Sequence, residues 1–227
     1  MTFAKKTILR SISNILLTTG LVILILDFTP IVLQELSYKL RVFRNVNYSV
    51  KAGDLPQGKR ASDLFGALVD GSKTLDIVPT NTDFSVIIEK IGVNAPIVKN
   101  VSVTEKDEYF EALKLGVAHA NSASTPDKGG NTYLFAHSSN NFWSIGKYAT
   151  IFNLLRKVEN GDKVNVFYDG VRYEYEVIGN EVVSGFNTNP LTREVLEPIL
   201  TLQTCDPPGT TLNRLVVTAK LIEVYKD

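Results

Sequence analysis

Apolar and polar positions are distributed differently along the two parts of the chain. Ile15 to Leu33 is a largely apolar run about as long as one membrane-spanning helix. Lys5, Lys6 and Arg10 precede it, and basic residues on that side favour a cytoplasmic N terminus with the rest of the chain outside. We therefore expect residues 1–44 to form an uncleaved membrane anchor. A cleaved signal peptide is the alternative, but no Ala-x-Ala-like cleavage site follows closely.

Turn-forming residues are frequent from Val46 to about Thr82. Within this stretch, Ala61 to Val69 has the composition of a short helix, with Ser62 or Asp63 as its cap. We interpret residues 45–82 as a stalk with a small appended element, which lifts the following domain off the bilayer.

Short β-branched or alternating runs follow from residue 83 onward and predict a β domain over residues 83–227. Strands are expected at Phe84–Ile91, Ile97–Val98, Thr132–Ala136, Lys163–Tyr168, Val171–Ile178, Ile199–Cys205 and Arg214–Val224. Asp169-Gly170 is a strong hairpin signal. Tyr148 to Lys157 has apolar residues at helical spacing, and one helical turn is expected within Asn187 to Pro198. Several short strands with turns between them predict a closed barrel or a sandwich.

Composition removes several classes of function. The chain has 24 basic and 24 acidic residues, so it lacks the basic excess that is typical of a nucleic-acid binder. One cysteine permits neither an intramolecular disulfide nor a cysteine-rich zinc site. Two histidines limit metal chemistry further.

The only cysteine lies in the stretch TLQTCDPPGTTLNRLVV. Cys205 ends one expected strand and Arg214 begins the next, with a proline- and glycine-rich loop between them. If the two strands pair as antiparallel neighbours, the guanidinium lies near the thiol. Positive charge there favours the nucleophilic thiolate, and arginine can also donate hydrogen bonds to an oxyanion. This pair therefore predicts a thiol nucleophile with an electrostatic partner.

A thiol nucleophile needs a group that moves protons, and histidine is the usual choice. His137 stands where the strand TYLFA ends and a polar loop begins, a common location for functional residues. His119 is further from any strand end that the sequence predicts. We therefore favour His137 as the base and expect His119 to be structural.

These segments together resemble the sortase family. TLQTC followed by NRLVV is similar to the family's TLxTC strand end with an arginine on the next strand. Asn131 to Ser138 (NTYLFAHS), after Gly130, resembles its GN-strand-H segment, and Ile87 to Val98 (IIEKIGVNAPIV) resembles its first barrel strands. The resemblance extends from about Ser85 to Val224, the whole predicted β domain.

The resemblance implies an eight-stranded, closed β-barrel with short helices, and a cysteine transpeptidase. Cys205 is then expected to attack a carbonyl of an LPXTG-like sorting signal on a secreted protein, forming a thioester. An amine on a cell-wall precursor or another protein resolves it. His137 would transfer protons to and from the two amines, and Arg214 would stabilise the oxyanion. The expected location is a bacterial cell membrane, with the catalytic domain outside.

The same resemblance suggests residues that contact the substrate. Thr204 directly precedes the thiol, and the connection from Ser184 to Pro198 corresponds to the loop that shapes the family's sorting-signal groove. The substrate contacts expected on this basis are Thr204, Leu202, Ser184, Asn187 and Leu191.

The sequence departs from the family pattern beside the site. Ala136 stands where many members carry glycine. Asp206 follows the cysteine, and its carboxylate would disfavour the thiolate.

Glu105, Asp107 and Glu108 form an acidic cluster that could bind calcium, as in some sortases. A solvated turn is the favoured reading, because calcium takes six to eight oxygen ligands. No metal and no other cofactor is therefore expected.

Two other classes of function are weighed against the transpeptidase. The first is another thiol enzyme of the cell envelope, such as an L,D-transpeptidase or a papain-like peptidase. Those require a different order or clustering of histidine and cysteine, since His137 here precedes Cys205 by many residues. The second is a catalytically silent, membrane-tethered β domain that binds an envelope partner.

Overall fold

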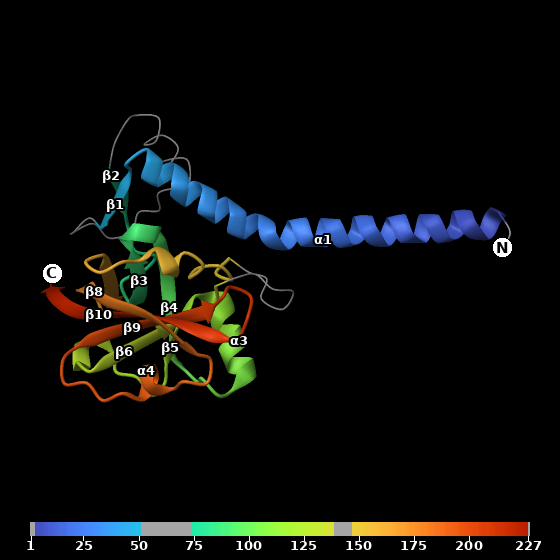
Figure 1. The fold of residues 1–227 in the computed structure, drawn as a ribbon. Helices are drawn as coiled ribbons and strands as arrows, with labels where there is room; N and C mark the ends of the chain where they lie inside the picture. Colours follow the sequence, from blue (N-terminus) through green and yellow to red (C-terminus); the bar gives the residue numbers. More distant parts are fainter. Residues whose placement is uncertain (1–2, 51–73, 139–146, 227) are drawn as a thin grey trace.

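The computed structural model describes residues 3–50, 74–138 and 147–226. A long helix, α1 (Phe3–Phe43), precedes a small parallel pair formed by β1 (Asn47–Val50) and β2 (Thr74–Ile77). Figure 1 shows α1 projecting from the rest of the molecule. The helix expected at Ala61–Val69 lies outside the described residues.

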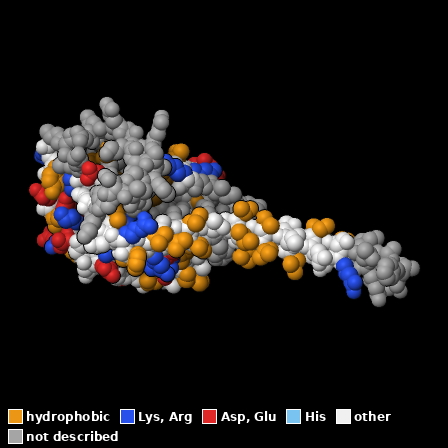
Figure 2. Space-filling model, turned by 90° about the horizontal axis from the view of Figure 1, so that it is seen from above, with side chains coloured by type: hydrophobic (Ala, Val, Ile, Leu, Met, Phe, Trp, Pro, Cys, Tyr) orange, Lys and Arg blue, Asp and Glu red, His pale blue; other side chains and the backbone are white. Residues whose placement is uncertain are grey.

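Helix α1 is long and apolar enough to cross a membrane, and its candidate span is Arg10–Phe43. Apolar side chains cover the projecting part of the helix in Figure 2. The helix bends in its second half (Figure 1). It ends because Asn45 adopts a left-handed φ of 54°, which turns the chain so that Val46 N–H donates to Arg41 O at 3.1 Å.

The β domain is a closed barrel. Its strands lie in the order β10-β8-β7-β3-β4-β5-β6-β9, which confirms the barrel and excludes the sandwich. Their bounds are β3 Phe84–Ile88, β4 Val93–Val101, β5 Val117–Ala120, β6 Asn131–Phe135, β7 Lys163–Tyr168, β8 Val171–Ser184, β9 Ile199–Asp206 and β10 Asn213–Tyr225. The short helices are α3 Lys106–Leu115, α4 Asn189–Thr192, η1 Glu89–Ile91, η2 Pro126–Lys128 and η3 Leu155–Lys157.

In two places, neighbouring strands of the barrel are parallel: β4 pairs with β5, and β6 pairs with β9. A parallel pair needs a crossover connection, and α3 supplies it between β4 and β5. Neither α3 nor β5 was predicted from the sequence. Strand β5 is only four residues long, and all four are buried, so it shows no alternation.

The hairpin prediction at Asp169-Gly170 is confirmed. Strands β7 and β8 pair antiparallel up to Tyr168 and Val171. Both turn residues have positive φ, 50° and 79°, as a two-residue hairpin turn requires. The helical turn expected between Asn187 and Pro198 is also present, as α4.

The helix expected over Tyr148–Lys157 is wrong in type. This segment forms successive tight turns, with backbone hydrogen bonds between residues three apart, such as Ile151 N–H to Tyr148 O at 3.1 Å. The short η3 follows. One N–H of this segment is used elsewhere, because Phe152 donates to His137 O at 3.1 Å. That long-range bond competes with regular helical bonding.

Alternate residues of β8 face the interior of the barrel, since Tyr173, Tyr175 and Val177 are all buried in the main core. Glu174, which lies between them in the strand, is also only 2 % exposed. Its carboxylate pairs with Lys163 at 2.5 Å and Arg172 at 2.7 Å, so the buried charge is compensated.

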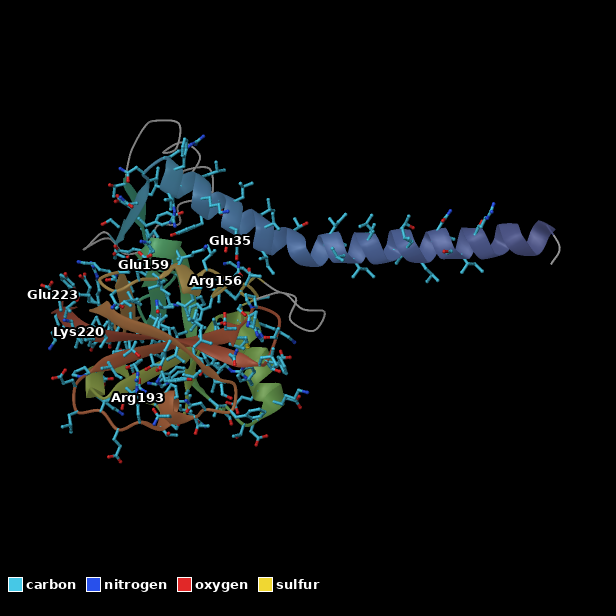
Figure 3. All side chains as sticks on the ribbon, in the orientation of Figure 1. Glu35, Arg156, Glu159, Arg193, Lys220 and Glu223 are labelled. Atoms are coloured by element: carbon cyan, nitrogen blue, oxygen red, sulfur yellow. The ribbon has the colours of Figure 1, made fainter. Side chains whose placement is uncertain are left out.

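Strands β9 and β10 fix the relation between the cysteine and the arginine. They pair antiparallel over their lengths, with Cys205 directly opposite Arg214 at the loop end. Lys220 and Glu223 lie towards the other end of β10, beside the C terminus (Figures 1 and 3). The thiol and the guanidinium therefore belong to one end of the barrel.

Candidate active site

The loop between β9 and β10 holds the guanidinium in place. Arg214 Nη1 donates to Asn213 O at 3.0 Å and to Thr211 O at 3.2 Å. Since Cys205 and Arg214 are Cα partners in the ladder, backbone pairing alone brings the two residues together. The antiparallel arrangement predicted from the sequence is confirmed.

His137 is positioned by the parallel pairing of β6 with β9. Ala136 N–H donates to Gln203 O at 3.1 Å, and Thr204 Oγ1 donates to Ala136 O at 2.8 Å. These bonds join the residue before the histidine to the two residues before the cysteine. On the other side, His137 O accepts from Phe152 N–H. The imidazole therefore starts from a backbone that is fixed on both sides.

One cavity of about 580 Å³ contains all three predicted catalytic side chains, Cys205, His137 and Arg214, in its wall. Its other lining residues come from five parts of the chain: the start of α3 with the residues before it, the end of β6 with the residue after His137, strand β9, the connection around α4, and the loop before β10. They are Val103, Thr104, Lys106, Tyr109, Phe110, Tyr133, Phe135, Ser138, Gly185, Asn187, Thr188, Leu191, Gln203, Gly209, Thr210 and Thr211. The fold thus brings the predicted triad together, while the role of each residue stays a prediction.

Helix α3 supplies an aromatic wall that the sequence analysis missed. The Phe110 ring lies nearly parallel to His137, with centroids 6.0 Å apart and 24° between the planes. Tyr109 meets the imidazole edge-on at 6.3 Å and stacks on Phe135 at 5.1 Å. The segment KDEYFEALKL carries both rings, but nothing in its spacing pointed to a site across the barrel.

Burial sets the protonation of the thiol. It raises the pKa of Cys205 above its usual value, and the nearby Arg214 guanidinium offsets part of that rise. The main penalty on the thiolate is therefore the desolvation of the sulfur, and not the Asp206 carboxylate that the sequence led us to expect. Cys205 is protonated at neutral pH in the resting site.

Burial also lowers the pKa of His137, so its imidazole is mainly neutral at pH 7. The Tyr109 phenol has its pKa raised to about 12, first by burial and then by the proximity of Cys205, with Arg214 opposing. Tyr109 therefore keeps its proton and remains a potential hydrogen-bond donor. The resting cavity contains a thiol, a neutral imidazole and a cationic guanidinium.

The expected substrate-contacting residues divide into two groups. Asn187 and Leu191, on the connection around α4, line the cavity. Ser184 is exposed at the end of β8 and is not among the lining residues. Leu202 and Thr204 require correction, because they are 0 % and 4 % exposed and do not line the cavity. Leu202 packs in the core, and Thr204 joins β9 to Ala136 as described above.

Several polar residues in the wall were not predicted, among them Tyr133, Gln203 and Ser138. Tyr133 donates its hydroxyl to Gln203 Oε1, and both side chains line the cavity. Ser138 is 3 % exposed, and its hydroxyl has no hydrogen-bond partner within the part of the chain that the structure describes. Its place directly after His137 was the one available signal.

Gly185 allows the connection after β8 to pack closely on the loop before β10. A Cβ there would lie 2.5 Å from Thr211 O and 2.9 Å from Leu212 O. Both are backbone atoms, so no side chain fits without moving the loop. Thr211 O also accepts from Arg214, and Gly185 thereby supports the guanidinium indirectly.

His119 lies on β5, fully buried and outside the cavity lining, in agreement with the structural role expected for it. Its Nδ1 accepts from Asn100 N–H at 3.5 Å, which leaves Nε2 to donate to Ser124 O at 3.1 Å. Burial lowers the pKa of His119, and this bonding fits the neutral ring.

The acidic cluster begins helix α3. Glu108 Oε1 accepts from Ser102 N–H at 3.0 Å. Within residues 3–50, 74–138 and 147–226 no group of three histidine, cysteine or acidic side chains has the spacing to hold a metal ion.

The fold is a closed β-barrel with a cysteine, a histidine and an arginine in the wall of one cavity, and comparison with known proteins identifies the family. The sortase domain model matches residues 86–222, more than half of the chain. The protein belongs to the sortase family, whose members are cysteine transpeptidases that act on sorting signals and amine acceptors. Comparison with curated protein sequences gives no match.

Solved sortase structures share the fold. Listeria monocytogenes sortase A is 21 % identical, with a TM-score of 0.52 over 64 % of this chain and 90 % of its own. The Clostridium perfringens sortase D5 transpeptidase is 21 % identical, with a TM-score of 0.51 over 73 % and 91 %. Sortase C1 from Streptococcus suis is 28 % identical, with a TM-score of 0.52 over 64 % and 75 %.

Proposed function

We propose that this sortase cleaves an LPXTG-like sorting signal through a thioester on Cys205 and transfers the acyl group to an amine of the cell envelope. The observation that supports this most strongly is the cavity shared by Cys205, His137 and Arg214. In the first step the sulfur attacks the scissile carbonyl, and the peptide C–N bond breaks as the departing amine takes a proton. In the second step an acceptor amine loses a proton, attacks the thioester and releases the thiol.

Arg214 is suited to oxyanion stabilisation. Its guanidinium carries a permanent charge and lies opposite the nucleophile, with Nη1 held by two backbone carbonyls. A charged donor fixed in advance loses little free energy to reorganisation when charge develops on the substrate oxygen. Arg214 also favours the thiolate over the thiol.

His137 is suited to both proton transfers. The active pair is a thiolate with an imidazolium, yet burial raises the pKa of Cys205 and lowers that of His137. The active pair is therefore a minor form of the resting enzyme, and its fraction is greatest between the two pKa values. Activity should peak around neutral pH and fall on both sides.

Helix α1 supports a single-pass membrane anchor. Basic residues precede its apolar run, and this favours a cytoplasmic N terminus with the barrel on the outer side. The proposed location is thus a bacterial cell membrane, with secreted proteins and an envelope amine as partners.

A transpeptidation assay tests the proposal. The full chain in detergent is incubated with a peptide containing Leu-Pro-X-Thr-Gly and with triglycine, and products are identified by mass spectrometry. We expect cleavage after threonine and a new Thr–Gly bond to triglycine. Cleavage elsewhere, or no product with any member of a library varied around this motif, would contradict the proposal.

Three variants separate the roles in the same assay. Cys205→Ala should remove all product, and His137→Ala and Arg214→Ala should each lower kcat/KM by at least about 100-fold. The matched control is Lys220→Ala, an exposed charge further along β10. Activity that persists in the histidine or arginine variant would overturn that assignment without affecting the family.

A further inference from the structure

The outer end of α1 contacts the barrel immediately after the apolar run. Gln34, the first residue beyond the run, donates from Nε2 to Thr150 Oγ1 at 2.6 Å and accepts from Asn153 Nδ2 at 3.2 Å. Glu35 pairs with Lys157 at 3.5 Å. No spacer therefore separates the apolar run from the barrel, in contrast to the stalk expected from the sequence.

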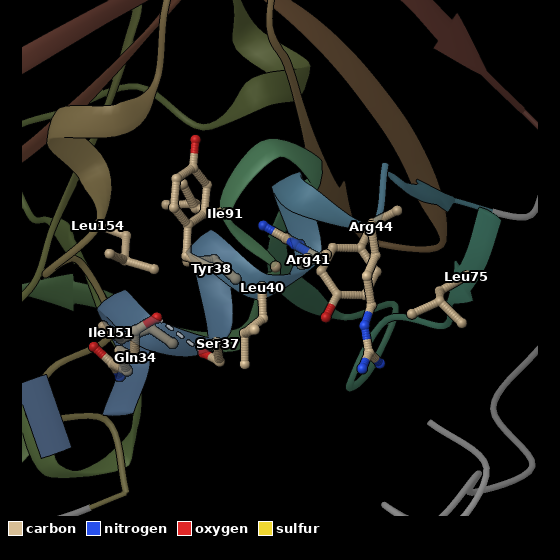
Figure 4. A pocket seen from close by; sticks show the side chains of 13 residues that line it. Gln34, Ser37, Tyr38, Leu40, Arg41, Arg44, Leu75, Ile91, Ile151 and Leu154 are labelled. Atoms are coloured by element: carbon tan, nitrogen blue, oxygen red, sulfur yellow. Dashed lines mark hydrogen bonds between the residues drawn. The ribbon is translucent and has the colours of Figure 1, made fainter. Parts of the chain in front are cut away.

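The contacts continue along two further turns of the helix. Tyr38 packs against the main core. Arg41 is 8 % exposed, donates to Lys90 O at 2.5 Å, and lies 4.2 Å from the centroid of the Tyr48 ring. Figure 4 shows Tyr38 beside Leu154, in a cavity of about 530 Å³ between helix and barrel. This end of α1 is thus part of the folded domain.

Helix geometry places these contacts at the bilayer surface. At about 1.5 Å per residue, the run from Ile15 to Leu33 is about 28 Å long, close to the thickness of the hydrocarbon core. Gln34 to Phe43 continues for about 15 Å, through the headgroup layer. A barrel that is bound along this stretch therefore lies directly at the lipid surface.

The free face of the same stretch is apolar. Leu33, Leu36 and Phe43 are 57 %, 51 % and 87 % exposed, and their spacing places them on one side of the helix. An apolar stripe that continues a membrane-spanning run fits the boundary between acyl chains and headgroups.

The end of the barrel that carries the cavity is turned towards the apolar part of α1. In Figure 1 the C terminus, where β10 ends, lies on the left, whereas α3 lies on the right, the side towards which α1 extends. Figure 3 places Glu223 and Lys220 of β10 at the left end. The cavity is lined by α3 together with β6, β9, the connection around α4 and the start of β10, and its α3 side lies on the right, the side towards which α1 extends.

We propose that the contacts between α1 and the barrel hold the cavity-bearing end against the outer surface of the bilayer, so that a substrate held at that surface is turned over faster than a soluble one. This inference rests on the proposed function and on its membrane anchor. A substrate confined to the same surface meets the cavity at a high effective concentration, whereas a soluble peptide gains no such advantage.

Distance from the lipid tests the orientation directly. The full chain with Cys205→Ala receives one cysteine, by Asp107→Cys on α3 or Glu223→Cys on β10, and each cysteine carries a spin label. Both variants are placed in phosphatidylcholine nanodiscs that contain a lipid with a nickel-chelating headgroup. We expect strong relaxation enhancement at position 107 and little at position 223. Equal enhancement at the two positions would overturn the proposal.

An insertion separates the anchor from the barrel without touching the cavity. Eight Gly and Ser residues between Leu33 and Gln34 leave the docked stretch in place but free it from the membrane run. We expect the difference between the two labels to disappear. The matched control is the same eight residues added after Asp227, which should keep the difference.

Two substrates connect orientation to function. One is a soluble sorting peptide, and the other is the same peptide with a C-terminal apolar segment inserted in the same bilayer. The insertion should lower turnover of the anchored peptide by about tenfold or more, and leave the soluble peptide unchanged. Equal effects on both would overturn the inference. A wild-type chain that cleaves neither contradicts the proposed function instead, while the spin labels still decide the orientation.

Discussion

At the scale of single residues, the protonation of Cys205 follows from two opposing effects on one sulfur. Desolvation disfavours the thiolate, and the guanidinium opposite favours it. The sequence predicted the second effect from the spacing of Cys205 and Arg214. It could not predict the first, because burial of the sulfur depends on residues that come from α3 and from the connection around α4.

Alkylation by iodoacetamide measures this balance. The rate should rise with pH and show an inflection above 9.0, the usual pKa of the thiol. Arg214→Gln should move the inflection further up and lower the rate at neutral pH by about tenfold for each pKa unit. Lys220→Gln, at the other end of β10, is the control and should leave the profile unchanged. An inflection below the usual pKa of the thiol would contradict this balance of effects. So would an arginine variant whose inflection and rate at neutral pH equal those of the wild type.

The imidazole of His137 offers a second measurement at the same scale. Phe110 stacks on the ring and contributes to its desolvation, which lowers the pKa. Phe110→Leu should let water reach the ring and move the pKa of His137 up towards its usual value. NMR titration can resolve this, since the chain has only two histidines. The His119 signal is the internal control, and an unchanged His137 titration would show that Phe110 does not shield the ring.

At the scale of elements, the site depends on the strand pairs β9–β10 and β6–β9. The first could be predicted, because two alternating runs flank a loop containing Pro207, Pro208 and Gly209. The second could not, since β6 and β9 are parallel and distant in sequence. The aromatic wall on α3 was also out of reach, because Tyr109 and Phe110 approach His137 only through the crossover between β4 and β5.

Thr204 connects the two strand ends, and Thr204→Val tests that role. Valine has nearly the same volume but cannot donate to Ala136 O, so a buried carbonyl loses its partner. We expect the free energy of unfolding to fall by about 1–2 kcal/mol and kcat to fall more than KM changes. Thr204→Ser keeps the hydroxyl and should restore kcat. Denaturant unfolding and steady-state kinetics provide the two readouts, and an unaffected kcat in the valine variant would argue against positioning.

At the scale of the whole molecule, one buried histidine, His119, and one half-buried histidine, His137, make the fold sensitive to acid. The pKa values of His119 and His137 lie below 6.5 in the folded state, so the unfolded chain binds more protons as the pH falls. Their contribution to stability is complete above pH 6.5 and is lost progressively below it. A tenfold difference in proton affinity corresponds to about 1.4 kcal/mol.

Urea unfolding between pH 5 and 8 measures this contribution. The free energy of unfolding should fall below pH 6.5, and His137→Gln should make the fall shallower because one of the two groups is gone. A slope that stays the same in this variant would assign the acid sensitivity to groups other than His137.

The whole molecule also joins anchor and barrel into one unit through Gln34, Glu35 and Arg41. The sequence predicted the anchor from its apolar run and its basic flank. It did not predict the docking, because each of these side chains finds its partner far away in the chain. With α1 as the proposed membrane anchor, this docking would fix the active site relative to the bilayer.

In the proposed mechanism, Cys205 carries the substrate's acyl group between two amines. Intact-mass analysis of the full chain, incubated with a sorting peptide and without an acceptor amine, tests it most directly. The account predicts a mass increase equal to the acyl fragment, located on Cys205, absent in Cys205→Ala and removed by triglycine. Cleavage of the peptide by Cys205→Ala at the wild-type rate would contradict this mechanism. An acyl fragment on another residue would contradict it as well.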